Sequence, residues 1–252
     1  MDLGIAGKRA AVAASSAGLG RASAQALAAA GVRVAICGRS QDRVDAALAT
    51  LAPVAGGDHV GLVADVGSVA GADSFVRRAS EALGGIDILV PNAGGPPPGT
   101  FATTPMEAYL PALELNLLST VAMCQAAVPA MTDAGWGRIV AITSHSVRQP
   151  IANLILSNTA RAGVTGFLKT LATEIARHGI TVNSVQPGLH ATDRMLSLHD
   201  GDTDGAARSV PTRTVGRAED FGAVVAFLCS DQARFINGTA VPVDGGAFGA
   251  LQ

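Results

Sequence analysis

The 252-residue chain lacks the features that mark several large classes of protein. Its formal net charge is only −2 and its Lys and Arg residues are scattered, which indicates no surface for nucleic acid. Cys37, Cys124 and Cys229 lie far apart without a CxxC pair, a spacing typical of buried thiols in a reducing compartment rather than of disulfides or a metal site. The N-terminus lacks the layout of a signal peptide, and no uninterrupted apolar run reaches membrane-spanning length. We therefore expect a cytoplasmic protein that binds neither nucleic acid, membrane nor metal.

Aromatic and charged residues are also scarce, at 4% and 15%, whereas 48% of the chain is apolar. Short, nearly continuous apolar runs alternate with longer helical stretches, as in parallel strands that are covered on both faces. The expected strands are 10–14, 32–37, 59–64, 86–90, 137–143, 180–185 and 239–243. The expected helices lie near 20–30, 41–51, 68–83, 105–133, 155–178 and 218–229. This α/β order predicts one Rossmann-type domain over 1–252, with a doubly wound parallel sheet flanked by helices.

Two irregular stretches, 91–104 and 186–217, interrupt this alternation. In a doubly wound sheet, ligands bind beyond the carboxyl ends of the strands, so we expect both loops to line the site, with 186–217 as a substrate loop. The second loop contains DGDTDG, with Asp200, Asp202 and Asp204, which imitates the start of a calcium-binding EF-hand loop. The twelfth position of such a loop needs a bidentate Glu and here is Pro211, so a solvated acidic lid segment is favoured.

A glycine-containing loop follows the first expected strand. Gly18 and Gly20 fall where strand turns into helix, so backbone amides at the positive end of the helix can approach a diphosphate. The fuller pattern has glycine where Ala14 stands, so the loop lacks one glycine. Ser15, Ser16 and Leu19 belong to the same loop.

The end of the second strand indicates which nucleotide binds. Gly38 occupies the position where an acidic residue would grip the adenosine ribose, and Arg39 and Ser40 follow it. An arginine there suits a 2′-phosphate, so NADP(H) is favoured over NAD(H). Asp65, which closes the third strand beside Val66, is placed to meet the adenine edge.

Further motifs follow in a fixed order: NAG at 92–94, Asn116 in ELNLLST, Ser144 in IVAITS, Pro187-Gly188 followed by Thr192, and VDGG at 243–246. From about residue 5 to residue 249, this ordered set resembles the short-chain dehydrogenase/reductase family. NAGGPPPG and LSNTARAG are similar to its 3-oxoacyl-[acyl-carrier-protein] reductase-like branch, in which a Tyr–Lys pair is likewise replaced. The resemblance implies a nicotinamide cofactor, a small carbonyl, alcohol or acyl-linked substrate, and a homodimer or homotetramer packed through the long helices. The predicted cofactor contacts are Ser15, Ser16, Gly18, Leu19, Gly20, Arg39, Ser40, Asp65, Val66, Asn92, Ala93, Gly94, Arg161, Pro187, Gly188, Leu189 and Thr192.

The resemblance also assigns catalytic positions. In the family a serine polarises the carbonyl, a tyrosine transfers the proton, a lysine holds the ribose, and an asparagine anchors a water. By position the serine is Ser144 and the asparagine is Asn116, whereas Ser157 and Arg161 stand in the tyrosine and lysine positions. Arg161 can still donate to ribose hydroxyls, but a serine hydroxyl is a much weaker and shorter acid than a phenol.

Two histidines could replace the missing tyrosine as proton donor. His145 follows Ser144, and His190 lies two residues past Gly188; histidine titrates near neutrality and suits general acid catalysis. Asn153 and Asn158 can bind substrate but supply no proton. Tyr109, the one tyrosine, precedes Asn116 by seven positions and is expected to be a packing residue.

The sequence thus predicts an NADP(H)-dependent oxidoreductase that interconverts a carbonyl and an alcohol, with the proton supplied by His145, water or the substrate. Two alternatives stay open because fold alone does not establish a reaction. One is a nucleotide-binding sensor or assembly partner without turnover, and the other is a lyase or isomerase that reuses the pocket.

Overall fold

The computed structural model describes residues 2–198 and 201–250. Seven strands form one sheet in the order β3-β2-β1-β4-β5-β6-β7, and all of its neighbouring strands are parallel. The strands are β1 (Arg9–Val12), β2 (Arg33–Gly38), β3 (Val60–Val63), β4 (Ile88–Val90), β5 (Gly137–Ile142), β6 (Ile180–Pro187) and β7 (Ala240–Val243). The predicted doubly wound α/β sheet is confirmed.

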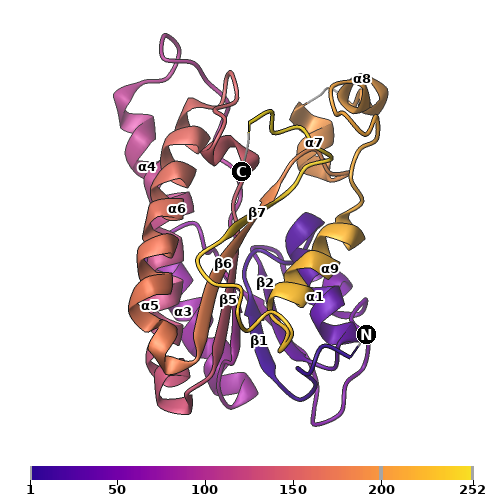
Figure 1. Ribbon diagram of the computed structural model, residues 1–252, viewed down its shortest axis with the longest axis vertical. Helices are drawn as coiled ribbons and strands as arrows, with labels where there is room; N and C mark the ends of the chain where they lie inside the picture. The colour runs from indigo at the N-terminus through magenta and orange to yellow at the C-terminus, as the bar shows by residue number, and fades with distance from the viewer. Residues whose placement is uncertain (1, 199–200, 251–252) are drawn as a thin grey trace.

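Helices cover both faces of this sheet (Figure 1). One layer contains α3 (Val69–Leu83), α5 (Ser119–Ala134) and α6 (Ile155–Ile175), and the other contains α1 (Gly18–Ala29), α2 (Gln41–Leu48) and α9 (Ala218–Leu228). Each layer buries its own apolar core against the sheet. All six residues of β5 are buried, because helices on both faces exclude water from a central parallel strand.

The register of the central strands positions the site. Val12 of β1 pairs with Ile36 of β2 on one side and with Val90 of β4 on the other, so these three strands end at one level. The chain winds outward in opposite directions from β1 and β4. Their boundary is the topological switch point, where a crevice opens beyond the carboxyl ends of the strands.

The expected helix over 105–133 is not continuous. The chain forms a 3₁₀ turn, η1 (Met106–Ala108), then α4 (Tyr109–Leu113), a π-helical turn, η2 (Glu114–Leu118), and finally α5. The π turn adds a residue to one turn of helix, and such turns occur frequently at functional sites. Here it carries Asn116, whose Nδ2 donates to the carbonyl oxygen of Gly94 at 2.8 Å.

Residues Met106–Ala134 are also long and apolar enough to span a membrane, with a mean hydropathy of 1.2. Glu107, Glu114 and Asn116 interrupt this segment, so it is not an uninterrupted apolar run. In the fold, the α5 part of this segment contributes to the core that α3, α5 and α6 bury against the sheet, through Met123, Cys124, Ala127 and Met131. Packing within the domain thus accounts for the apolar side chains of α5, whereas Met106 and Leu110 before it are exposed.

The loop expected over 186–217 contains two short helices, α7 (Asp193–Leu198) and α8 (Thr203–Arg208), which stand above the sheet in Figure 1. Asp202 caps α8 by accepting a hydrogen bond from the backbone N–H of Gly205 at 2.7 Å. Asp200 lies outside the described residues. Within 2–198 and 201–250, no cluster of His, Cys, Asp and Glu could hold a metal ion. Asp202 is thus explained as a helix cap.

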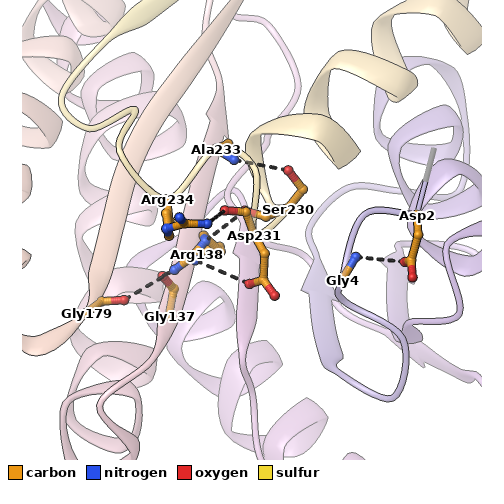
Figure 2. A network of polar contacts seen from close by, with 9 residues as sticks. All are labelled: Asp2, Gly4, Gly137, Arg138, Gly179, Ser230, Asp231, Ala233 and Arg234. Atoms are coloured by element: carbon orange, nitrogen blue, oxygen red, sulfur yellow. Dashed lines mark hydrogen bonds and ion pairs between the residues drawn. The ribbon is translucent and has the colours of Figure 1, made fainter.

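At the amino-terminal ends of the central strands, a buried arginine links β5 to the turn before β6 and to the segment after α9. Arg138 of β5 is 3% exposed and donates to the carbonyl oxygens of Gly137, Gly179 and Ser230. Its Nη2 lies 3.8 Å from a carboxylate oxygen of Asp231 (Figure 2). Burial lowers the pKa of Arg138, and the charge of Asp231 partly offsets this effect. The network holds together the amino-terminal ends of these strands, at the opposite end of the sheet from the candidate site.

The three cysteines are free and buried, as expected. Burial raises the pKa of each thiol to about 12, so all three are protonated at neutral pH and are not reactive.

Candidate active site

A cavity of about 470 Å³ opens beyond the carboxyl ends of the central strands. Its walls come from the glycine loop, the loop after β4, the end of β5, the start of α6 and the segment after β6. The predicted site residues that line it are Gly18, Leu19, Gly20, Asn92, Ala93, Gly94, Ser144, His145, Ser157, Arg161, Pro187, Gly188, Leu189 and Thr192. Residues far apart in the sequence therefore meet at the switch point.

The glycine loop has the shape that a diphosphate requires. Gly18 has a φ of +57°, in the left-handed region, and α1 begins there without a hydrogen bond from a capping side chain. A Cβ on Gly20 would lie 2.5 Å from the carbonyl oxygen of Ala14, so only glycine fits. Ala14 itself has a φ of +45°, which explains why the fuller pattern has glycine at this position. The unpaired amides of the first turn can thus bind phosphate oxygens.

Two predicted cofactor residues hold this loop in place. Ser15 is fully buried; its Oγ donates to the carbonyl oxygen of Val12 at 2.6 Å and accepts the N–H of Cys37 at 3.0 Å. The Ser15 side chain therefore links β1 to β2 and has no access to a ligand. Asn92 donates through Nδ2 to the carbonyl oxygens of Ala13 and Ala14, both at 3.3 Å, and also lines the cavity.

The residues predicted for the adenosine end lie at the ends of β2 and β3. Arg39 and Ser40 are exposed at the junction with α2, outside the lining of the main cavity. Asp65 is exposed and accepts the N–H of Gly67 at 3.0 Å, whereas the Val66 side chain packs in the core. An adjoining cavity of about 340 Å³ lies between α1, α2 and α9 and contains Ser16.

Ser144 and His145 lie directly after β5 and face the main cavity. Ser144 begins a 3₁₀ turn, η3 (His145–Val147), and its Oγ accepts the N–H of Ser146 at 3.1 Å. Nδ1 of His145 lies 3.1 Å from the carbonyl oxygen of Pro187. Since a carbonyl only accepts, this contact places a proton on Nδ1 and leaves Nε2 for other partners.

Arg161 reaches the same place from α6. Its Nη1 donates to the carbonyl oxygens of Ile142 at 3.2 Å and Thr143 at 3.0 Å, at the end of β5. Burial, and secondly the charge of Arg194, lowers the pKa of Arg161 to about 10, which leaves the guanidinium charged at neutral pH. Ser157, one turn earlier, is nearly buried and also lines the cavity.

The other polar residues considered for catalysis or substrate binding are His190, Asn158, Tyr109 and Asn153, and each is placed less favourably than Ser144 and His145. His190 lines the cavity but is buried, its ring 5.2 Å from that of Phe221 and edge-on to it, and burial lowers its pKa despite the Gly188 carbonyl. Asn158 donates to the carbonyl oxygen of Ile151 at 2.9 Å and therefore holds the loop before α6. Tyr109 and Asn153 lie outside the lining of the cavity.

Comparison with known proteins identifies the family to which this chain belongs. Residues 13–247 match a family model described as enoyl-(acyl carrier protein) reductase. The human dehydrogenase/reductase SDR family member 4 is 36% identical over 245 residues, covering 96% of this chain and 88% of the relative. The chain belongs to the short-chain dehydrogenase/reductase family. The 3-oxoacyl-[acyl-carrier-protein] reductase of Escherichia coli is also 36% identical, over 244 residues, covering 96% of this chain and 98% of the relative.

Among solved structures of the family, L-sorbose reductase from Gluconobacter frateurii, complexed with NADPH and L-sorbose, has a TM-score of 0.92. It is 31% identical, and the match covers 100% of both chains. The family resemblance drawn from the motifs is therefore confirmed, and the chain is that of a short-chain oxidoreductase.

Among the cavity residues that the motif analysis missed are two arginines. Arg43, on the first turn of α2, borders both cavities and lies 3.6 Å from Asp193. Arg194, on α7, lines the main cavity and donates through Nη2 to the carbonyl oxygen of Pro96 at 3.0 Å. Neither falls in a family motif, and each reaches the site only because its short helix packs against the crevice.

Proposed function

We propose that the protein is an NADP(H)-dependent oxidoreductase that interconverts a carbonyl and an alcohol through a non-standard active site. The observation that carries the proposal is the single cavity in which the glycine loop faces Ser144, His145 and Arg161. The likeness to an L-sorbose reductase complexed with NADPH supports the choice of cofactor. When bound, NADPH supplies the hydride to the carbonyl carbon.

The residues present fit this cofactor. The left-handed Gly18 and the uncapped start of α1 would bind the diphosphate, and Arg43 would add a positive charge beside it. Arg39 and Ser40, where β2 meets α2, would receive the 2′-phosphate. Arg161 would direct one of its remaining N–H groups to the ribose beside Ser144.

His145 takes over the proton transfer in this proposal. Its Nδ1–H is held by the Pro187 carbonyl and the residue lines the cavity, so Nε2 would carry the transferable proton. Ser144 Oγ donates to the substrate oxygen and polarises the carbonyl. The carbon gains the hydride, the oxygen gains the Nε2 proton, and neutral His145 is reprotonated from solvent.

The test measures NADPH oxidation with L-sorbose and with a 3-oxoacyl thioester. A general acid contributes roughly 10²–10⁴-fold, so His145→Gln should lower kcat by that factor while leaving the Kd for NADPH within twofold. Ser144→Ala should likewise lower kcat. His178 lies outside the lining of the cavity and accepts a hydrogen bond from Arg177; it provides the control His178→Gln, with no expected effect.

The outcome separates the three functions. NADPH binding without turnover of any carbonyl would favour a silent nucleotide-binding protein, and product formation without NADPH consumption would favour a lyase or isomerase. Unchanged kcat in both His145→Gln and Ser144→Ala would show that the assigned residues are not catalytic.

A further inference from the structure

Two arginines from different elements line the main cavity. Arg161, on α6, is anchored at the end of β5 through Nη1, which donates to the carbonyl oxygens of Ile142 and Thr143. Arg194, on α7, is anchored to the loop after β4 by its bond to the Pro96 carbonyl. Its guanidinium lies directly on Gly95, where an added Cβ would be 2.8 Å from Nη2. Backbone contacts therefore fix both guanidinium groups before any ligand binds.

No carboxylate balances this charge among the described residues of the cavity wall. Asp193 is the one acidic residue there; its side chain is 86% exposed and lies 3.6 Å from Arg43. The ion pairs found in residues 2–198 and 201–250 include neither Arg161 nor Arg194. The pKa of Arg161 is lowered first by its burial and second by the positive charge of Arg194, so an anion bound between the two groups would relieve both effects.

Each guanidinium also has donors to spare. A guanidinium carries five N–H groups, and the hydrogen bonds found here use one nitrogen of each side chain. The planar fork matches the two oxygens of a carboxylate better than a lysine ammonium would. Ile151, Leu154 and Met195 line the same cavity and can cover an apolar chain beside such an anion.

We propose that Arg161 and Arg194 form a subsite for a carboxylate of the substrate, so that the natural substrates are oxo acids and the corresponding hydroxy acids. The inference rests on the proposed oxidoreductase function and names its substrate class. Since Arg161 bonds to Thr143, next to Ser144, the subsite lies beside the predicted reacting oxygen. The carboxylate therefore orients the carbonyl toward Ser144 and His145.

The experiment compares pyruvate, acetoacetate and levulinate with their methyl esters, which keep the carbonyl and lose the charge. In the wild type, the best acid should have a kcat/KM at least tenfold above its ester. Arg194→Gln should lower kcat/KM for the acid by roughly 10–100-fold through KM, since a charged hydrogen-bond donor is lost, and leave the ester unaffected. Arg194→Lys keeps the charge without the fork and should fall between the two.

A binding measurement makes the subsite testable apart from catalysis. Calorimetric titration of each acid into NADP⁺-saturated protein should show binding to the wild type and its loss in Arg194→Gln. Arg208→Gln removes one exposed charge from α8 and is the matched control, with binding and kcat/KM unchanged.

Three results would overturn the proposal: equal affinity for acids and esters, acid binding that survives Arg194→Gln, or an equal weakening of NADPH binding in that variant. The third would assign the arginines to the cofactor diphosphate instead. If no carbonyl is reduced, the oxidoreductase proposal fails, and calorimetry alone still decides whether the anion subsite exists.

Discussion

The contact between α1 and α9 supplies a sharp test of the fold that supports the cofactor loop. Gly222 of α9 lies against the backbone of α1: a Cβ there would be 2.7 Å from the carbonyl carbon of Ala22 and closer still to its oxygen. Backbone atoms cannot rotate away, so Gly222→Ala forces the two helices apart. Gly166, inside α6, is exposed, and a Cβ there would meet nothing within 4 Å.

The two glycines therefore form a matched pair. Alanine in place of either gains up to about 1 kcal/mol of helix propensity, and overpacking at Gly222 costs about 3 kcal/mol at the upper end of its usual range. We expect the unfolding free energy to fall by about 2 kcal/mol in Gly222→Ala and to rise by up to about 1 kcal/mol in Gly166→Ala. For a chain of this size, the corresponding Tm changes are a fall of roughly 4–8 °C and a rise of roughly 2–4 °C.

Thermal unfolding followed by circular dichroism measures both, with size-exclusion chromatography to verify that the assembly is unchanged. Since α1 also presents Gly18 and Gly20 to the cofactor, Gly222→Ala should weaken NADPH binding as well, whereas Gly166→Ala should not. Equal Tm shifts in the two variants would refute the steric argument and with it the close packing of α1 on α9.

Three further predictions follow from single contacts. Burial raises the pKa of Asp87, but hydrogen bonds from the Arg9 side chain and backbone outweigh that effect, so the pKa lies below its usual 3.8. The ionised carboxylate therefore stabilises the fold fully above about pH 4, and this stabilisation is lost as the pH falls through the folded pKa. Acid unfolding curves of Asp87→Asn should lack this pH-dependent loss of stability. Arg138→Ala removes hydrogen bonds to three carbonyl oxygens, of which that of Gly179 also accepts a backbone N–H, from Gly137, and urea titration should show a loss of about 3 kcal/mol with an unchanged Kd for NADPH. Gly20→Ala should abolish NADPH binding in calorimetry, because the new Cβ would meet the Ala14 carbonyl; binding at wild-type strength would contradict the assigned loop.

The sequence was sufficient for the architecture because buried parallel strands leave a plain signal. The apolar runs at 10–14 and 137–143 correspond to β1 and β5 with errors of one or two residues. The run over 105–133 looked like one helix because its apolar residues recur with helical spacing. The extra residue of the π turn around Asn116, whose side chain donates to the carbonyl oxygen of Gly94, leaves no mark in such a pattern.

The site was predictable where a residue acts through its backbone or through a fixed motif. Gly18, Asn92 and Ser144 lie in the cavity because the strand ends place them there. Ser15 shows the limit of this reasoning: it belongs to the right loop, yet its side chain bonds inward to β1 and β2. Arg194 shows the converse, since the position of α7 depends on packing that no local spacing encodes.

Arg161 stands where the family has lysine, and this replacement keeps a positive charge at the position while changing what that charge can do. Arg161 places a positive charge beside the end of β5. One of its nitrogens donates to the carbonyl oxygens of Ile142 and Thr143, which would otherwise lack this donor. An arginine in this position stays charged at neutral pH even when partly buried, and with Ser157 in the tyrosine position no phenol remains for it to activate. The charge is then available for binding rather than for proton transfer. This division is consistent with a site in which His145 moves the proton and the arginines select an anionic substrate.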